Sequence, residues 1–467
     1  MLMGGGSKNG GPRHPRASTH KLRMDAQPDE LVPPLPTSIK PIPTTFTSSL
    51  SAWWGLSRRQ TAEAELHLYR ASGLFQGAVL GNAAHVTDDG PDGMAQAFYK
   101  NSHEEKNGPI PRSNAFATVA KQLATSEAVK GKVGCIRNVH LHGTKTGTWI
   151  WPRYASRYIH MVEIGTPLRK IERPRDEMQI VVVHGYGAGG AYFFRNIRAL
   201  ASIPNSRLYC LDWLGMGCSS RSPYRMRGTA PRTKERVEAS ETFFLGALEE
   251  WRDKMQIEKM VLVGHSLGGY LSTVYALKHP ERVSELVLVS PAGFPDGTAK
   301  EIVGNDPRVR RFGPRTLRFM GWLWDRNVSP FGILRASTVF GPMLMGMYTR
   351  RRFQTLTPEE LQSLHAYCHG IFTDKSSSEQ CLCDILAPGA FARYPLVHRV
   401  APLRMPMVFL YGEHDWMDRA GADQAQAILH EAGNHNVQVH TVSRAGHHLY
   451  LDNPAEFGAL VQEVLAS

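Results

Sequence analysis

Residues Val261 to Tyr270, VLVGHSLGGY, place a serine between two glycines in the pattern Gly264-x-Ser266-x-Gly268. An apolar run precedes the pattern and a stretch compatible with a helix follows it, as at a sharp strand-to-helix turn. Glycines are needed there because flanking side chains would clash. Such a turn exposes the hydroxyl group of Ser266, so the pattern predicts a nucleophile rather than an ordinary tight turn.

A serine hydroxyl needs a histidine to take its proton and a carboxylate to hold that histidine. In hydrolases with this serine turn the acid and then the histidine follow the serine in the chain. The loop YGEHDWMD offers Asp415 and the loop SRAGHHLYLDNP offers His447, each after an apolar run. We predict His447 as the base and Asp415 as the acid. Asp418 is the rival acid, and Asp415 is favoured by its spacing from the strand end.

Three other histidines lie beside these motifs. His448 follows the predicted base, His414 precedes the predicted acid, and His265 precedes the serine. A loop histidine is usually a polar surface or supporting group. We therefore expect all three to have structural roles.

Attack of a serine on an ester creates an oxyanion, which backbone N–H groups must stabilise. The run VVVHGYGAGG, residues 181–190, follows the form of a loop that supplies one such donor. We predict the N–H groups of Tyr186 and Leu267 as the two donors. A phosphate-binding turn is the alternative, but the run lacks the Lys and Ser/Thr of a P-loop and the spacing of a dinucleotide fingerprint.

Short β-branched runs alternate with helical stretches over much of the chain. The expected strands are NVHLHG, RYIHMVEIG, QIVVVHG, RLYCLD, KMVLVGHS, ELVLVS, PMVFLYG and NVQVHTV. Residues 234–256 read as a helix with Val237, Phe244, Leu248, Trp251 and Met255 on one face. This alternation predicts an α/β fold with a mostly parallel sheet covered by helices on both faces.

Together with LDWLGMGCSS, these motifs resemble the α/β-hydrolase superfamily over roughly residues 50–467, outside an insertion at about 77–134. WWG near residue 53, HGYGAG, PAGFP and GHHLYLDNP are similar to a subfamily of lipid enzymes. It includes the lipid-droplet lipase coactivator, N-acyl phospholipid lipases, a lysophosphatidic acid acyltransferase and the mitochondrial cardiolipin-specific deacylase. The coactivator lacks a serine nucleophile, so Ser266 implies an active enzyme.

The expected organisation has four parts. Residues 1–49 form a basic tail and Pro-rich linker, 50–292 the first part of the hydrolase core, 293–400 a helical cap and 401–467 the last part of the core. Residues 293–353 contain eleven basic and four acidic residues, interleaved with aromatic residues and Met. Such a surface suits a cap over the active site, an anionic membrane interface, or both. For Trp53 and Trp54 two roles stay open: contact with a membrane interface, and burial against the protein core, which is at least as well supported.

Composition narrows the partners and the compartment. The formal charge of +12 favours anionic surfaces, and no nucleic-acid-binding motif is present, so acidic phospholipid is the expected partner. Six irregularly spaced cysteines predict neither a disulfide framework nor a zinc site, and the mechanism needs no cofactor. No apolar run is long enough to span a bilayer. Basic residues without acids before Asp25 predict a mitochondrial transit peptide, with a disordered tail as the alternative.

His447 and Asp452 form a His-x4-Asp pattern, which the acyltransferase members of the subfamily share. Asp452 and Asn453 also precede Pro454, as an N-cap does, and we favour that capping role. The sequence thus predicts a phospholipase-type serine hydrolase, similar to the cardiolipin deacylase. The alternatives are an acyl-CoA-dependent lysophosphatidic acid acyltransferase, a noncatalytic lipid-binding coactivator and a soluble hydrolase of small esters. Epoxide or haloalkane chemistry is disfavoured because it needs a carboxylate in place of Ser266.

Overall fold

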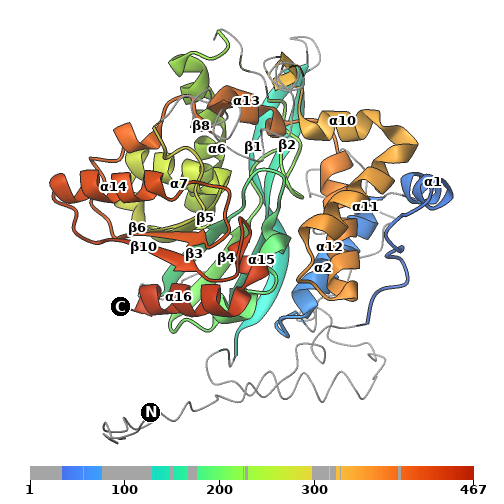
Figure 1. The fold of residues 1–467 in the computed structure, drawn as a ribbon, viewed down its shortest axis with the longest axis horizontal. Coiled ribbons are helices and arrows are strands. Elements are labelled where there is room, and N and C mark those ends of the chain that lie inside the picture. Colours follow the sequence, from blue (N-terminus) through green and yellow to red (C-terminus); the bar gives the residue numbers. More distant parts are fainter. Residues whose placement is uncertain are drawn as a thin grey trace, which may run out of the picture.

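The structure is a computed structural model of the full chain (Figure 1). It describes residues 34–55, 57–75, 129, 131–147, 152–166, 176–224, 226, 230–296, 315, 322–324, 326, 328–387 and 391–466. The predicted transit peptide and most of the 77–134 insertion lie outside the described residues, although strand β1 already begins at Val133. Part of the basic stretch at 293–353 also lies outside them.

An eight-stranded sheet forms the centre of the molecule, in the order β1-β2-β4-β3-β5-β6-β9-β10. β1 pairs antiparallel with β2, and β2 with β4, while the remaining neighbours are parallel. This confirms the predicted α/β fold with its mostly parallel sheet. The strands are β1 (Val133–Gly147), β2 (Pro152–Gly165), β3 (Met178–Val183), β4 (Ser206–Leu211), β5 (Met260–His265), β6 (Val283–Val289), β9 (Met407–Gly412) and β10 (Val437–Val442).

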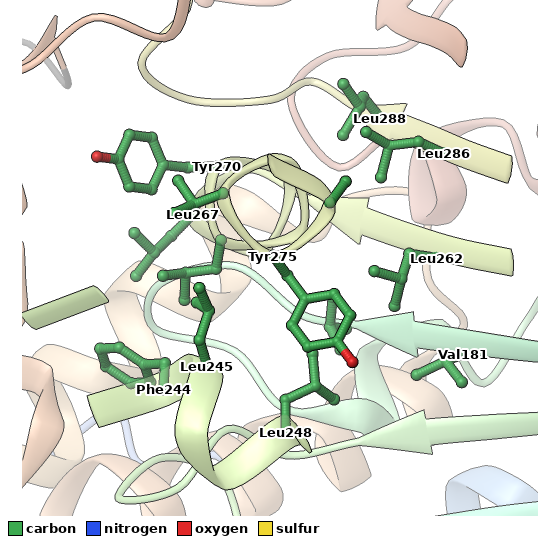
Figure 2. Close-up of a cluster of buried hydrophobic side chains, with 14 of the residues drawn as sticks. Val181, Phe244, Leu245, Leu248, Leu262, Leu267, Tyr270, Tyr275, Leu286 and Leu288 are labelled. Carbon is green, nitrogen blue, oxygen red and sulfur yellow. The ribbon is translucent and has the colours of Figure 1, made fainter. Parts of the chain in front are cut away.

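Most residues of the central strands are apolar, as expected for parallel strands that are covered on both faces. In β3, Val181 faces one core and Val182 the other. Figure 2 shows the first core, where side chains of β3, β5 and β6 meet helices α6 (Lys234–Lys254) and α7 (Leu267–Lys278). The predicted helix at 234–256 is thereby confirmed, and its five apolar residues are all buried.

The second face is covered by elements from both ends of the chain and by two short helices that follow β3. They are α2 (Arg58–Arg70), η4 (Gly190–Phe193), α5 (Ile197–Ala201), α15 (Leu449–Asp452) and α16 (Pro454–Ala466). Helix α14 (Ala420–Glu431) packs against β10 and shares the first core. None of the described helices has the length and apolar character that crossing a bilayer requires.

Between β6 and β9 the described chain forms mainly helices, as the sequence predicted. The elements are α10 (Pro330–Ala336), η6 (Thr338–Phe340), α11 (Gly341–Arg352), α12 (Pro358–Thr373), α13 (Cys381–Ile385), β7 (Leu386–Ala387), β8 (Phe391–Ala392) and η8 (Leu396–His398). Helix α12 packs against α2 and α10, and α11 against α1 (Phe46–Trp54), so these five helices form one layer beside the sheet, while α13 packs against α6 (Figure 1). The exposure of Trp54, at 80%, rules out its burial against the core.

Candidate active site

The serine turn has the backbone conformation that its glycines predict. Ser266 joins β5 to α7 with φ 54° and ψ −117°, a strained conformation for a residue with a side chain. A Cβ atom on Gly268 would lie 2.5 Å from the backbone oxygen of His184, and one on Gly264 2.7 Å from that of Gly268. Only glycine fits at these two positions, so the turn holds the serine side chain at the carboxyl end of the sheet.

His447 lies between the serine and the predicted acid. Its Nε2 is 3.1 Å from the Oγ of Ser266, and its Nδ1 is 3.1 Å from Oδ1 of Asp415. The structure thus brings together three residues from segments far apart in the chain. Asp418 does not join them, because its carboxylate accepts the N–H of Ala420 at 2.9 Å at the start of α14.

Asp415 is held as a carboxylate by several donors. Burial raises its pKa, but hydrogen bonds from His447, from the Ser290 hydroxyl and from the N–H of Met417 outweigh burial, and the net pKa lies below its ordinary value. The Met417 N–H donates to Oδ1 at 3.0 Å, and the Ser290 hydroxyl donates to Oδ2. Ionised Asp415 can therefore orient the imidazole of His447 with its Nε2 free to accept a proton.

The two predicted oxyanion donors flank the serine. Leu267 is the first residue of α7, where a backbone N–H has no partner within the helix. Tyr186 follows β3 and lines the same cavity as Ser266 and Leu267. Both residues therefore line the cavity beside Ser266, and their role as oxyanion donors stays a prediction.

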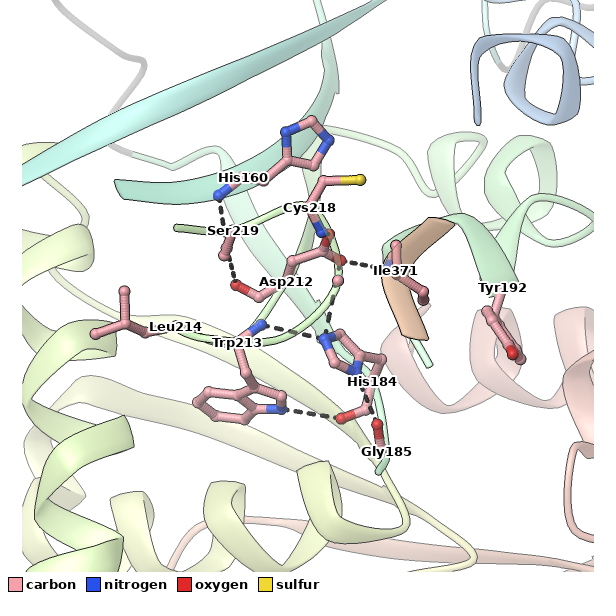
Figure 3. A network of polar contacts seen from close by, with 12 residues as sticks. His160, His184, Gly185, Tyr192, Asp212, Trp213, Leu214, Cys218, Ser219 and Ile371 are labelled. Carbon is pink, nitrogen blue, oxygen red and sulfur yellow. Dashed lines mark hydrogen bonds and ion pairs between the residues drawn. The ribbon is translucent and has the colours of Figure 1, made fainter. Parts of the chain in front are cut away.

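The residues LDWLGMGCSS, for which no individual role was predicted, support the loop that carries Tyr186. The imidazole of His184 accepts the N–H of Trp213 at 3.1 Å, while the Trp213 indole donates to the His184 carbonyl at 2.9 Å (Figure 3). Asp212 accepts the N–H of Gly190 on the far side of the loop at 2.5 Å. Burial lowers the pKa of His184, so its ring stays neutral and able to accept. This network holds in place the backbone of the loop after β3, which carries the predicted oxyanion donor, the N–H group of Tyr186.

His265 and His448 have supporting places, in line with the prediction. Nε2 of His265 is 2.9 Å from the carbonyl oxygen of His447, and its Nδ1 is 3.3 Å from the Tyr450 hydroxyl. Burial first, and then the neighbouring His447, lower the pKa of His265 well below its ordinary value. Neutral His265 therefore donates to the backbone of His447 and fixes its position. The ring of His448 faces Arg352 instead of Ser266.

Asp452 does not contact His447. Its Oδ2 accepts the N–H of Gly446 at 3.0 Å, and its Oδ1 is 3.5 Å from Arg352. The predicted capping of α16 belongs to Asn453, whose Oδ1 accepts the N–H of Glu456 at 3.4 Å; Asp452 is instead the last residue of α15. Asp452 thus stabilises the loop before His447 through Gly446 and takes no part in the proton-transfer chain.

A cavity of about 570 Å³ opens beside Ser266. The segment between β6 and β9 supplies one wall through Trp324, Tyr348, Arg352, Leu382 and Leu386, and the loop after β9 adds Trp416 and Met417. This volume is in the range of a small-molecule site, and the wall is mostly apolar with few polar groups. An acyl chain could lie along this wall with its ester at Ser266.

The structure also shows a buried polar group that sequence patterns did not reveal. Glu65, His160 and Cys218 bring their ligand-type atoms within 4.8 Å of one another, although they come from α2, β2 and the loop after β4. His160 and Glu65 already form an ion pair at 2.9 Å. All six cysteines are free, which confirms that the chain has no disulfide framework.

Comparison with known proteins agrees with this architecture. The family model of the alpha/beta hydrolase fold matches residues 179–454, more than half of the chain, and the chain belongs to this family. A probable 1-acylglycerol-3-phosphate O-acyltransferase of Oryza sativa subsp. japonica is 36% identical over 289 residues, which are 60% of this chain and 66% of that protein. A 1-acylglycerol-3-phosphate O-acyltransferase of Arabidopsis thaliana is 37% identical over 60% of this chain and 65% of its own length.

A (lyso)-N-acylphosphatidylethanolamine lipase of Mus musculus is 30% identical over 63% of this chain and 80% of its own length. The chain covers slightly less than two thirds of the two plant relatives. These similarities confirm the resemblance to a lipid-metabolising subfamily of α/β-hydrolases.

Proposed function

We propose that this chain is a serine-dependent phospholipid acyl hydrolase that acts at a membrane surface. The observation that carries the proposal is the continuous contact from Ser266 through His447 to Asp415 beside an apolar cavity. Relatives named as a phospholipid lipase and as acyltransferases of a lipid phosphate support a lipid ester as the substrate.

The reaction follows from the positions of these groups. Ser266 Oγ attacks the ester carbonyl while His447 Nε2 takes its proton, and the N–H groups of Tyr186 and Leu267 stabilise the oxyanion. The C–O bond to the leaving alcohol then breaks, His447 returns the proton to that alcohol, and an acyl-serine remains. Water, deprotonated by His447, attacks the acyl-serine; the bond between the acyl carbon and Ser266 Oγ breaks, His447 returns the proton to Oγ, and the fatty acid leaves.

Two tests address this reaction together. A fluorophosphonate probe should label the protein, and Ser266→Ala should abolish both the labelling and the release of fatty acid from phospholipid. Ser272→Ala is the matched control, because Ser272 lies on the same helix α7 with a hydroxyl that has no partner in the described part of the chain. An unlabelled but folded wild-type protein would support the noncatalytic coactivator instead.

The main alternative is acyl transfer to a lysophosphatidic acid hydroxyl, since an acyl-serine can pass its acyl group to any bound alcohol. The names of the two plant relatives favour it. Acyl-CoA and lysophosphatidic acid supplied together discriminate: we expect fatty acid release to exceed the formation of phosphatidic acid. Transfer far above release would replace the hydrolase by the acyltransferase.

We further propose that an exposed apolar surface contacts the membrane. It extends over α1, α10, η6 and α11, which pack on one another, and comprises Phe46, Leu50, Trp53, Trp54, Ile333, Phe340, Leu344, Met347 and Tyr348. Tyr348 also lines the cavity, so the surface adjoins the route to Ser266. Flotation with anionic vesicles should be weakened by Trp54→Ser, while hydrolysis of a water-soluble ester is retained. Unchanged flotation of the variant would reject this surface as the membrane contact, and no flotation of the wild-type protein would favour a soluble esterase.

We also propose that the substrate is an anionic lipid such as cardiolipin and that the protein acts in mitochondria. The basic net charge and the basic N-terminal residues support both. Loss of the gene should alter the acyl composition of cardiolipin, and a Ser266→Ala replacement should reproduce that change. An unaltered mitochondrial lipid profile in both would remove cardiolipin as the substrate.

A further inference from the structure

Arg352 brings a positive charge into the cavity beside Ser266. It is the last residue of α11 and lines the cavity together with Tyr348 and His448. Its side chain is 26% exposed, so it is neither buried in the core nor free in solvent. The mechanism described above does not use it.

The surroundings of Arg352 leave its charge incompletely balanced. Asp452 is its nearest acid, at 3.5 Å, and the other oxygen of Asp452 accepts the Gly446 N–H. Its second partner is the ring of His448, whose pKa is lowered well below its ordinary value by burial first and by Arg352 next, so this partner is neutral. Among the described residues that line the cavity there is no Asp or Glu.

Another part of the lining is apolar. Leu382 and Leu386 come from α13 and β7, and Trp324, whose indole donates to the Leu386 carbonyl at 3.1 Å, lines the cavity with them. A cavity with an apolar wall, a nucleophile and one guanidinium fits an ester that carries both an acyl chain and an anion. A planar guanidinium can bind two phosphate oxygens at once, which a single ammonium cannot.

We propose that Arg352 binds the phosphate group of the lipid while the acyl chain lies against Leu382 and Leu386. This inference rests on the proposed function, since it assumes that the lipid ester enters this cavity. Arg352 thereby selects phosphate-bearing esters over neutral glycerides. Asp452 and His448 act as positioning residues that hold the guanidinium in place.

Binding can be measured without turnover in the Ser266→Ala background. Octyl phosphate and octanol, both below their aggregation limits, are titrated calorimetrically and differ only in the phosphate. Adding Arg352→Gln should weaken octyl phosphate binding by about ten- to a hundredfold, as expected for the loss of a charge-assisted hydrogen bond, and leave octanol binding in place. Arg352→Lys should bind octyl phosphate with intermediate affinity, because lysine keeps the positive charge but lacks the planar, paired N–H donors of the guanidinium.

Arg351→Gln is the matched control, because Arg351 is an exposed neighbour on the same helix turn. It should change neither affinity. Equal weakening of both ligands by Arg352→Gln would show a purely structural role, and unchanged octyl phosphate binding would also overturn the proposal. Selective loss of octyl phosphate binding, combined with no phospholipid hydrolysis by the protein with Ser266 intact, would uphold the anion site and reject the hydrolase function.

Discussion

The hydroxyl group of Ser290 donates a hydrogen bond to the carboxylate of Asp415. Ser290 directly follows β6 and has φ 45°. It contacts one carboxylate oxygen of Asp415, while His447 contacts the other. Asp415 is thus held both by its own loop and by the residue at the end of the adjacent strand β6.

Ser290→Ala should lower kcat and leave KM nearly unchanged, because Asp415 keeps His447 but loses one donor. A hydrogen bond to a charged group predicts a fall of about tenfold or somewhat more. Steady-state kinetics on a soluble ester measure it, and thermal unfolding tests whether the variant is folded. A rise in KM at constant kcat would instead mean that Ser290 shapes the substrate site.

Asp415→Asn and Asp418→Asn form a matched pair on one loop. Asp415→Asn should reduce kcat by about 10³- to 10⁴-fold, because the amide favours the wrong tautomer of His447. Asp418→Asn should leave kcat almost unaltered, since Asn can still accept the N–H of Ala420. The reverse ranking of the two variants would assign the acid role to Asp418.

Gly268→Ala and Gly246→Ala should have opposite effects on stability. A Cβ on Gly268 meets backbone oxygens of His184 and Val183 at 2.5 and 2.7 Å, so alanine must displace the turn and abolish activity. Gly246 lies inside α6 with open space around its Cβ position, and alanine there should stabilise the protein by about 1 kcal/mol. Denaturant unfolding of both variants measures the difference. Normal activity of Gly268→Ala would contradict the geometry of the serine turn.

The buried pair of His160 and Glu65 makes stability depend on pH. Burial lowers the pKa of His160, but Glu65 raises it by more, and the net pKa lies above its ordinary value of 6.5. Because the folded-state pKa is the higher one, the stabilisation is complete below about pH 6.5 and is lost as pH rises through the folded-state pKa. Thermal unfolding should show Tm falling over that window.

Glu65→Gln is the variant that tests the source of this dependence. Glutamine keeps the size of the side chain but removes its charge, so the fall in Tm above pH 6.5 should become smaller. An equal fall in the wild type and the variant would mean that other groups cause it.

Local sequence patterns predicted the sheet and the proton-transfer chain because each depends on short-range chemistry. The serine turn requires glycines next to Ser266, and buried parallel strands require continuous apolar runs. Chain order predicted His447 and the loop of the acid, while Asp415 was only favoured over Asp418 by its spacing from the strand end.

Contacts between distant segments left no such local signal. The bonds of Asp212 to Gly190, of His265 to His447 and of Arg352 to Asp452 each join segments that only the folded sheet brings together. The capping pattern named Asp452 and Asn453 together, and only the folded structure assigns the cap to Asn453. The exposure of Trp54 depends on how α1 packs on α11, which composition alone does not determine.

The layer made by the N-terminal helices determines how far this chain can be shortened. Leu66, Leu68 and Tyr69 of α2 are at most 3% exposed, and Phe457 and Val461 of α16 are fully buried. A recombinant fragment trimmed to the recognised hydrolase segment, 179–454, would lose α1, α2 and the strands β1 and β2 on one side and nearly all of α16 on the other, which leaves bare apolar surface and an open sheet edge. Such a fragment should aggregate on expression, whereas one that starts before Pro34 and runs to the C-terminus keeps the catalytic body whole.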